Sequence, residues 1–224
     1  MDTNQAIQNI QNLDLKDATK EDVHKEVRNL GRLGQMAIRV PKGTNIYRAR
    51  PNKVKNGNYE TFNTKEVLSY APIDCKNEDS FGRASLPNNT VFYGSLPPIN
   101  HQEEMGIDNE HSSDPQELRP ELITIAESLP WSRYPDINGY QKFTISKWRL
   151  EEDLILATGG LHRASKNPTI QEWREDLLSN TESKLPGEKE SIIKKNEFIA
   201  DQFSKEVPDG EEHEYKISAV LTDR

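Results

Sequence analysis

Apolar residues occur in short groups with two different spacings, and this pattern limits the folds open to the chain. Residues 36–40 and 143–146 alternate apolar and polar side chains, which predicts half-buried strands. Residues 19–30 instead repeat apolar side chains every three or four positions, which predicts a helix with Thr19 as its capping residue. No apolar run approaches the roughly 20 residues of a membrane span.

The remaining elements are predicted from the same spacings and from turn residues. Further strands are expected at 45–50, 91–94 and 154–157, the last of them buried, a turn at 87–89, and helices at 118–129, 169–177, 192–208 and 215–224. Residues 1–18 are expected to be frayed or a loose helix, 52–80 and 96–116 mostly irregular, and 180–191 a charged linker. Short strands mixed with helices in no regular alternation favour an α+β fold over a doubly wound sheet.

Charge and cysteine content narrow the function classes. The 224 residues include 29 Lys and Arg against 37 Asp and Glu, a net charge of −8. This balance argues against a general nucleic-acid binder, which needs a basic face. The single cysteine, Cys75, excludes an internal disulfide and a cysteine-rich zinc site. The N-terminus is polar and has no signal-peptide core, so a cytoplasmic protein with no nucleic-acid or membrane partner is expected.

Several common catalytic motifs are missing from the sequence. There is no GxxxxGK[ST], no GxGxxG and no GxSxG, so nucleotide sites of the first two types and a nucleophile elbow are not supported. The five histidines show no HExxH or other helical pairing, and no metal site is expected.

Arginines paired with aromatic residues are the main candidate chemistry. Arg48 lies between Tyr47 and Arg50, and Arg83 precedes the predicted strand at 91–94. The planar guanidinium fork suits a phosphate, and a tyrosine face can stack on a flat ring. The alternative is that Arg48 and Arg50 alternate on the exposed side of an edge strand.

The order of three segments resembles the RES domain family, which is named after an arginine, a glutamate and a serine. The segments are IYRARP at 46–51, FGRASLPNNTVFYGS at 81–95 and a helix that contains ITIAES at 123–128. The resemblance implies an α+β, ADP-ribosyltransferase-like fold over residues 41–224, with 1–40 as an N-terminal helical extension. Many members are toxins of toxin–antitoxin pairs that destroy NAD by hydrolysis or phosphorolysis.

The resemblance also implies roles for individual residues. It places Arg48 and Arg83 on the pyrophosphate of NAD, with Tyr47 beside them as a further substrate-binding residue. Tyr93 would lie near the nicotinamide or its ribose. Glu127 would lie beside the carbon that becomes cationic, where one carboxylate stabilises an oxocarbenium-like centre.

The resemblance therefore implies an NAD glycohydrolase or phosphorylase. NAD would be a substrate rather than a recycled cofactor, the acceptor would be water or phosphate, and a cognate antitoxin would be a partner. The late strand with the family serine is not found, so the chain is expected to stop before it. Two other functions stay open: a non-catalytic interaction module that keeps the fold, and an ADP-ribosyltransferase that modifies a macromolecule.

Overall fold

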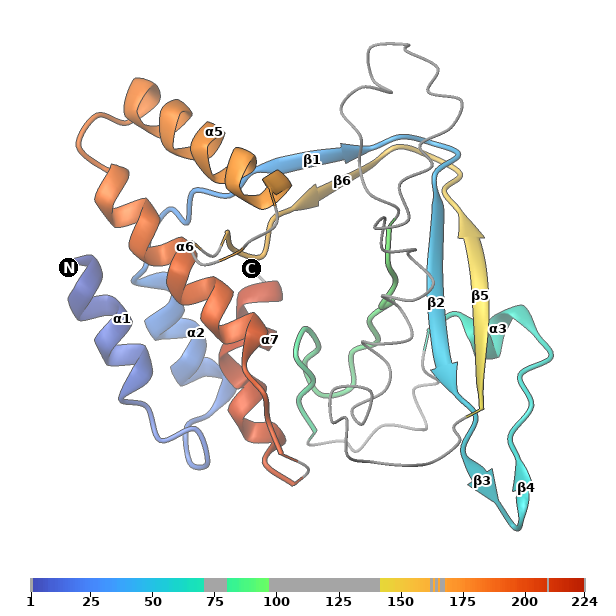
Figure 1. Ribbon diagram of the computed structural model, residues 1–224. Helices are drawn as coiled ribbons and strands as arrows, with labels where there is room; N and C mark the ends of the chain where they lie inside the picture. Colours follow the sequence, from blue (N-terminus) through green and yellow to red (C-terminus); the bar gives the residue numbers. More distant parts are fainter. Residues whose placement is uncertain are drawn as a thin grey trace. The chain divides into compact units, whose positions relative to one another are not determined.

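The protein is an α+β chain with short antiparallel sheets, as the sequence predicts. The computed structural model describes residues 2–70, 80–96, 142–161, 163, 165, 168–208 and 210–223. The helices of this part are α1 (Thr3–Gln11), α2 (Lys20–Arg28), α3 (Lys65–Leu68), α5 (Pro168–Lys184), α6 (Lys189–Ser204) and α7 (Lys216–Thr222), with a 3-10 turn at Glu212–Tyr215 (Figure 1). The strands are β1 (Ala37–Val40), β2 (Asn45–Pro51), β3 (Val54–Lys55), β4 (Asn58–Tyr59), β5 (Phe143–Arg149) and β6 (Leu154–Ala157).

The chain divides into two compact units by its internal contacts. The first, called the helical unit, comprises Met1–Ile38, Pro72–Val91 and Ile155–Arg224. The second, called the sheet unit, comprises Arg39–Ala71 and Phe92–Leu154. The chain passes between the units four times: within β1, after Ala71, after Val91 and at the start of β6; β1 and β6 pair with each other. The family boundary expected between residues 40 and 41 stays a prediction.

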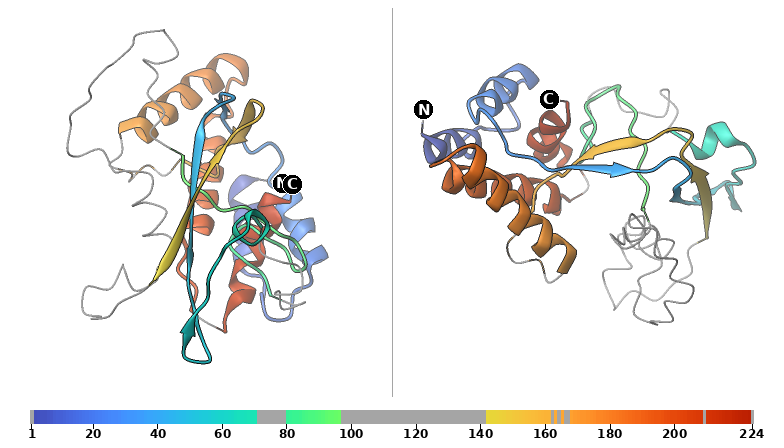
Figure 2. Two further views of the ribbon diagram at one scale, coloured as in Figure 1. Left: turned by 90° about the vertical axis from the view of Figure 1, so that its right-hand side faces the viewer. Right: turned by 90° about the horizontal axis from the view of Figure 1, so that it is seen from above.

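The N-terminal helix α1 is better ordered than its polar sequence predicts. Ala6 and Ile10 lie one turn apart on the same face, and both side chains are completely buried. They contribute to the core of the helical unit together with residues of α2, α6 and α7 (Figure 2). The expected frayed or loose segment is therefore wrong for residues 3–11, because two apolar side chains are enough to anchor a helix of this length.

Helix α2 confirms the capping box that the sequence predicts. Thr19 Oγ1 accepts a hydrogen bond from the backbone N–H of Asp22, and the Asp22 carboxylate accepts one from the backbone N–H of Thr19. The bonds from Thr19 lower the pKa of the Asp22 carboxyl. Val23 and Val27 of the predicted apolar stripe are buried.

The C-terminal helices correct two sequence predictions. Residues 180–191 are not a linker, because α5 continues to Lys184 and α6 already begins at Lys189. Helix α5 begins at Pro168, one residue before the predicted start at 169, and has 17 residues, so it extends beyond the predicted end at 177. The predicted helices at 192–208 and 215–224 are confirmed as α6 and α7; α6 begins before its predicted start and ends before 208, and α7 lies just inside its predicted range.

Two apolar clusters form the core of the helical unit. The larger one joins α1, α2, α6 and α7, and its completely or almost completely buried members are Ala6, Ile10, Val23, Val27, Leu30, Ile199, Ala219 and Val220. The smaller one joins α5 and α6 through Leu161, Leu177 and Ile192. Gly160 lies directly against α6, where a Cβ atom would come within 2.6 Å of the Ala200 backbone nitrogen.

The sheet unit is built on the antiparallel pair of β2 and β5. Both strands are predicted from the sequence, and the register pairs Arg48 with Ser146 and Arg50 with Thr144. A hairpin of β3 and β4 follows β2 in a region predicted to be irregular. Its turn contains Asn56 and Gly57, both with positive φ, which is the typical Asn-Gly signal of a two-residue hairpin.

Two further strand predictions are corrected by the structure. Val91–Gly94 forms no strand, and only an isolated bridge from Ser95 to Tyr47 is present there. Strand β6 exists at its predicted place but is largely exposed, with Ile155 at 62%. None of the helices in the described part of the chain combines the length and apolar character needed to cross a membrane.

Candidate functional site

Arg48 lies in the middle of β2, and its side chain is buried in the sheet unit. Only 8% of its surface is exposed. The expectation that Arg48 sits on the exposed side of an edge strand is wrong, because β2 pairs with β5 along one edge and with Ser95 along the other. Arg50, two residues on, points to the same side of the strand.

The Arg48 guanidinium lies against the first ring of an aromatic group. Its central carbon lies 5.1 Å from the centre of the Phe92 ring, a cation–π contact. The Phe92 ring is packed edge-on between Trp148, at 5.5 Å, and Tyr70, at 6.0 Å between ring centres. These three rings form what we call the Arg48 aromatic wall.

The guanidinium of Arg48 has unused hydrogen-bonding capacity. Its Nη1 atom is buried and has no hydrogen-bond partner among the residues that the structure describes. Burial lowers the pKa of Arg48, and the neighbouring positive charge of Arg50 lowers it further, while Tyr70 and Tyr93 raise it. No carboxylate of the described residues forms an ion pair with Arg48. A buried cation to which the described residues offer no counter-charge is suited to bind an anionic ligand.

The backbone of Arg48 is held by a short chain of hydrogen bonds from β5. The indole Nε1–H of Trp148 donates to Ser146 Oγ over 2.8 Å, and the Ser146 hydroxyl donates to the Arg48 carbonyl over 3.3 Å. Trp148 therefore contributes twice, because it packs on Phe92 and also fixes the strand that carries Arg48.

The segment 92–95 is placed against β2 by two backbone hydrogen bonds between Tyr47 and Ser95. These join the N–H of each residue to the carbonyl of the other over 2.9 and 2.7 Å. Gly94 is required here, because a Cβ atom would come within 2.6 Å of Ile46 and 3.2 Å of the Tyr47 carbonyl. This close approach puts Phe92 and Tyr93 beside Arg48.

Arg50 is already occupied, in contrast to Arg48. Its guanidinium lies 4.4 Å from the centre of the Phe62 ring and donates to the carbonyl of Val67. We therefore assign Arg50 a structural role, because its bond to Val67 connects α3 to β2. Its positive charge also lowers the pKa of Arg48.

The structure brings Tyr93 to the Arg48 site but not Tyr47. Tyr93 is 50% exposed and acts electrostatically on Arg48. Tyr47 alternates with Arg48 and so projects from the other face of β2, where the Lys147 ammonium lies 5.8 Å from its ring centre. The two tyrosines of the predicted site therefore lie on opposite faces of the sheet.

The structure does not group the other two predicted site residues, Arg83 and Glu127, with Arg48 in one described unit. Arg83 belongs to the helical unit, where it donates to the Lys205 carbonyl over 3.2 Å and lies 5.8 Å from the Tyr215 ring centre. Through these contacts Arg83 connects the turn at 81–86 to the C-terminal helices. Glu127 and the helix predicted around it lie outside the described residues.

Sequence reasoning missed the three rings of the Arg48 aromatic wall. Phe92 stands next to Tyr93 in the FYG segment, so the sequence contains a local signal for this ring. Trp148 follows the predicted strand at 143–146 and alternates with Ser146 onto the same face. Tyr70 carries no local signal, because only folding after α3 brings it to Phe92.

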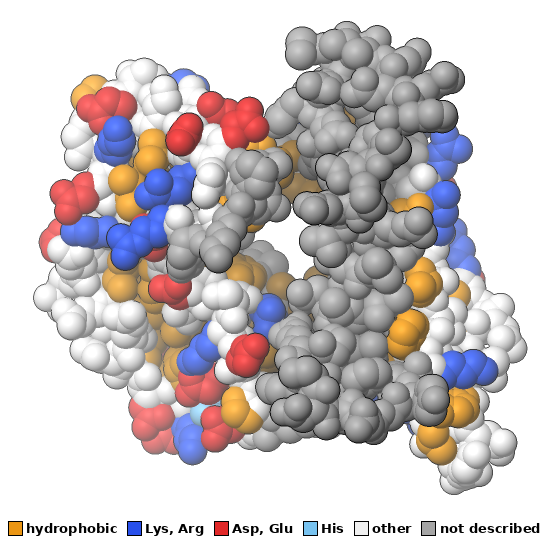
Figure 3. Space-filling model, viewed as in Figure 1, with side chains coloured by type: hydrophobic (Ala, Val, Ile, Leu, Met, Phe, Trp, Pro, Cys, Tyr) orange, Lys and Arg blue, Asp and Glu red, His pale blue; other side chains and the backbone are white. Residues whose placement is uncertain are grey.

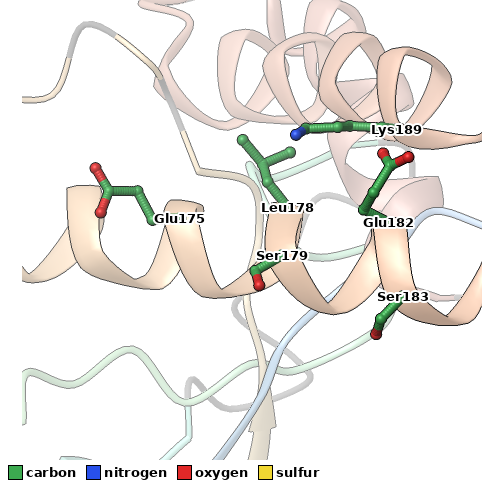
Figure 4. Close-up of a pocket in the computed structure, with 6 residues that line it drawn as sticks. All are labelled: Glu175, Leu178, Ser179, Glu182, Ser183 and Lys189. Atoms are coloured by element: carbon green, nitrogen blue, oxygen red, sulfur yellow. The ribbon is translucent and has the colours of Figure 1, made fainter.

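Two hollows in the helical unit carry none of the predicted site residues. One, of about 570 Å³, lies on α5 and the start of α6, with Lys189 along Leu178 and Glu182 and with Glu175 pointing away from them (Figure 4). The other, of about 340 Å³, is mainly apolar and lies between α6, α7 and the chain around Thr158. Within the described ranges, no three His, Cys, Asp or Glu side chains gather as a metal site would require.

Comparisons with known proteins give no relative for the chain. Searches of family models, of curated proteins and of solved structures each find no match.

Proposed function

We propose that the protein binds NAD at Arg48 and cleaves the bond between nicotinamide and ribose. The observation that carries this proposal is the buried Arg48 guanidinium, with its partnerless Nη1 atom and the rings around it. An anionic group and a flat ring are the two features that such a site recognises. NAD contains both an anionic pyrophosphate and flat rings. The resemblance of the IYRARP and FYG segments to RES domains supports NAD as the ligand.

In this proposal Arg48 holds a phosphate of the dinucleotide and Tyr93 lies beside the nicotinamide ribose. The C–N bond breaks, and its electron pair leaves with the nicotinamide nitrogen, which becomes neutral. An oxygen of water or of phosphate forms the new bond to the ribose carbon, and with water one proton is released. The products are nicotinamide and ADP-ribose or its phosphate, and Glu127 is the proposed carboxylate that stabilises the cationic ribose.

The proposal includes the finer fold and partner assignments. The sheet and helices would belong to an ADP-ribosyltransferase-like RES fold, and a cognate antitoxin would hold the enzyme inactive. Arg83 stays a predicted pyrophosphate ligand, although its present contacts with Lys205 and Tyr215 would have to open for it.

A second function follows from the absence of a counter-charge at the site. Among the residues that the structure describes, no carboxylate pairs with Arg48. A module that binds a nucleotide without cleaving it needs only the cation and the rings, so non-catalytic binding is the second candidate.

Calorimetric titration with NAD tests the binding half of the proposal. Arg48→Met removes the charge that receives the phosphate, and a charge-assisted contact of this kind is worth about 1.5–3 kcal/mol. We therefore expect the affinity for NAD to fall by about one to two decades.

Arg149→Met is the matched control for the Arg48 titration. It removes the same charge from an exposed position of β5, so the affinity should stay within about twofold of wild type. Equal losses in both variants, or a wild-type protein that does not bind NAD, would show that Arg48 is not the binding residue.

A further inference from the structure

Along its side away from β2, strand β5 pairs with no strand in the part of the chain that the structure describes. The Asn52 N–H donates to the Lys142 carbonyl over 2.8 Å, and the Leu150 N–H donates to the Thr44 carbonyl over 3.0 Å. These bonds fix the alternation of the antiparallel pair, so the backbone groups of residues 144, 146 and 148 face β2. The N–H and carbonyl groups of Phe143, Ile145, Lys147 and Arg149 then face away from β2.

No described residue covers this outer edge. The sheet contains only β2 and β5, and no backbone hydrogen bond joins residues 143, 145, 147 or 149 to another part of the described chain on that side. Ile145 is 41% exposed, and Lys147 and Arg149 are exposed too. An uncovered strand of seven residues is long enough to pair with another strand.

The side chains at this edge are basic. Lys142, Lys147 and Arg149 lie on or next to β5, and β5 itself contains no Asp or Glu. Figure 3 shows Lys and Arg side chains on the side of the sheet unit where β5 runs. The described residues of the sheet unit carry ten Lys and Arg against five Asp and Glu, although the whole chain has a net charge of −8.

This charge decides between two kinds of partner strand. A second copy of β5 paired antiparallel over its full length would place Lys147 opposite Ile145 and Arg149 opposite Phe143, so the seam would hold four cationic side chains and no carboxylate. A strand with Asp or Glu at alternate positions would instead place a carboxylate opposite Lys147 and another opposite Arg149. The same positions that discourage self-pairing therefore favour an acidic partner.

We propose that the outer edge of β5 binds an extended acidic segment of a partner protein as an added antiparallel strand. The backbone groups of residues 143, 145, 147 and 149 supply the hydrogen bonds, and Lys147 and Arg149 select the acidic side chains. An apolar side chain of the partner lies opposite Ile145. This edge is separate from the Arg48 site. Lys147 and Tyr47 lie on one face of the sheet, and Arg48 lies on the opposite face.

Fluorescence anisotropy with three labelled seven-residue peptides tests the proposal on the full chain. The first has glutamates opposite Lys147 and Arg149 and a valine opposite Ile145, and we expect saturable binding. The second replaces both glutamates by lysines, and the third keeps the glutamates but carries N-methyl groups on the amides that would face β5. Both should bind at least about tenfold more weakly, because one lacks the charges and the other lacks the hydrogen bonds.

Variants of the protein separate strand addition from general attraction. Ile145→Pro removes an outward N–H without disturbing the bonds to β2, since proline is tolerated on an edge strand, and it should weaken the acidic peptide at least about tenfold. The pair Lys147→Glu and Arg149→Glu should do the same. Lys53→Glu makes the same charge change as either single substitution, at an exposed position before β3, and should leave the affinity within about twofold. Circular dichroism confirms that each variant is folded.

Four results would overturn the proposal. One is equal binding of the N-methylated peptide, and another is an equal loss in Lys53→Glu, since either would mean unspecific charge attraction. A third is tight binding of a single-stranded oligonucleotide that Ile145→Pro does not weaken. The fourth is sedimentation as a dimer that Ile145→Pro dissociates, which would make a second copy of the chain the occupant. The outcome is independent of NAD binding, because Arg48→Met should leave peptide binding unchanged.

Discussion

At the scale of single residues, Arg48 and Lys216 are buried cations with opposite surroundings. Arg48 has a buried nitrogen without a partner, whereas the Lys216 ammonium donates to the carbonyls of Leu15 and Ala18 over 2.7 and 2.8 Å. A buried charge without a partner costs stability, and a chain keeps such a residue where it has a use for it. We therefore assign Arg48 to ligand binding and Lys216 to the stability of the fold.

Arg48→Met should therefore leave the ligand-free protein as stable as wild type or more stable. The methionine side chain can fill the space against Phe92, and the uncompensated charge is removed, which we expect to raise the free energy of unfolding by up to about 1 kcal/mol. Urea denaturation without NAD measures this change. A loss of more than about 1 kcal/mol would show that Arg48 is a structural residue.

At the scale of elements, Lys216 ties α7 to the turn between α1 and α2. Its ammonium also lies 5.5 Å from the centre of the Phe81 ring. Lys216→Met keeps the apolar stem but leaves the two carbonyls without their donor, so the free energy of unfolding should fall by about 2–3 kcal/mol. The same urea experiment measures this loss, and an unchanged midpoint would mean that water replaces the ammonium at both carbonyls.

The elements that the sequence predicts well are those with a local signal. The Thr19 capping box and the alternation at 143–146 both depend on neighbouring residues, and both are confirmed. The hairpin at Asn56-Gly57 also has a local signal, which the polar surroundings obscured. Helix α1 could not be predicted in the same way, because Ala6 and Ile10 gain their burial from helices at the far end of the chain.

The candidate site was predictable only in part for the same reason. The pairing of Arg48 with Tyr93 follows from the order of motifs, and the structure places both in the sheet unit. The packing of Tyr70 and Trp148 around Phe92 depends on contacts between residues far apart in sequence. The segment 91–94 failed as a strand because Gly94 approaches β2 too closely for a regular ladder, leaving only the bridge at Ser95.

At the scale of the whole molecule, the net charge hides an uneven distribution. The acidic total excludes a chain that is basic throughout, but the described residues of the sheet unit are basic, and the Arg48 site and the β5 edge both lie there. Over its full bounds the sheet unit has 12 Lys and Arg against 14 Asp and Glu, so the excess of positive charge belongs to the described residues alone. The helical unit supplies most of the buried apolar core, and the sheet unit carries the proposed chemistry.

The most direct measurement of the central claim is nicotinamide release from NAD by the purified chain. Wild-type protein at saturating NAD should release nicotinamide, with and without phosphate as acceptor. Arg48→Met should release it at least about tenfold more slowly at NAD concentrations below saturation, because the substrate is held more weakly. Two results would contradict NAD cleavage at Arg48. One is nicotinamide release by Arg48→Met at the wild-type rate, and the other is no nicotinamide release by the wild-type protein.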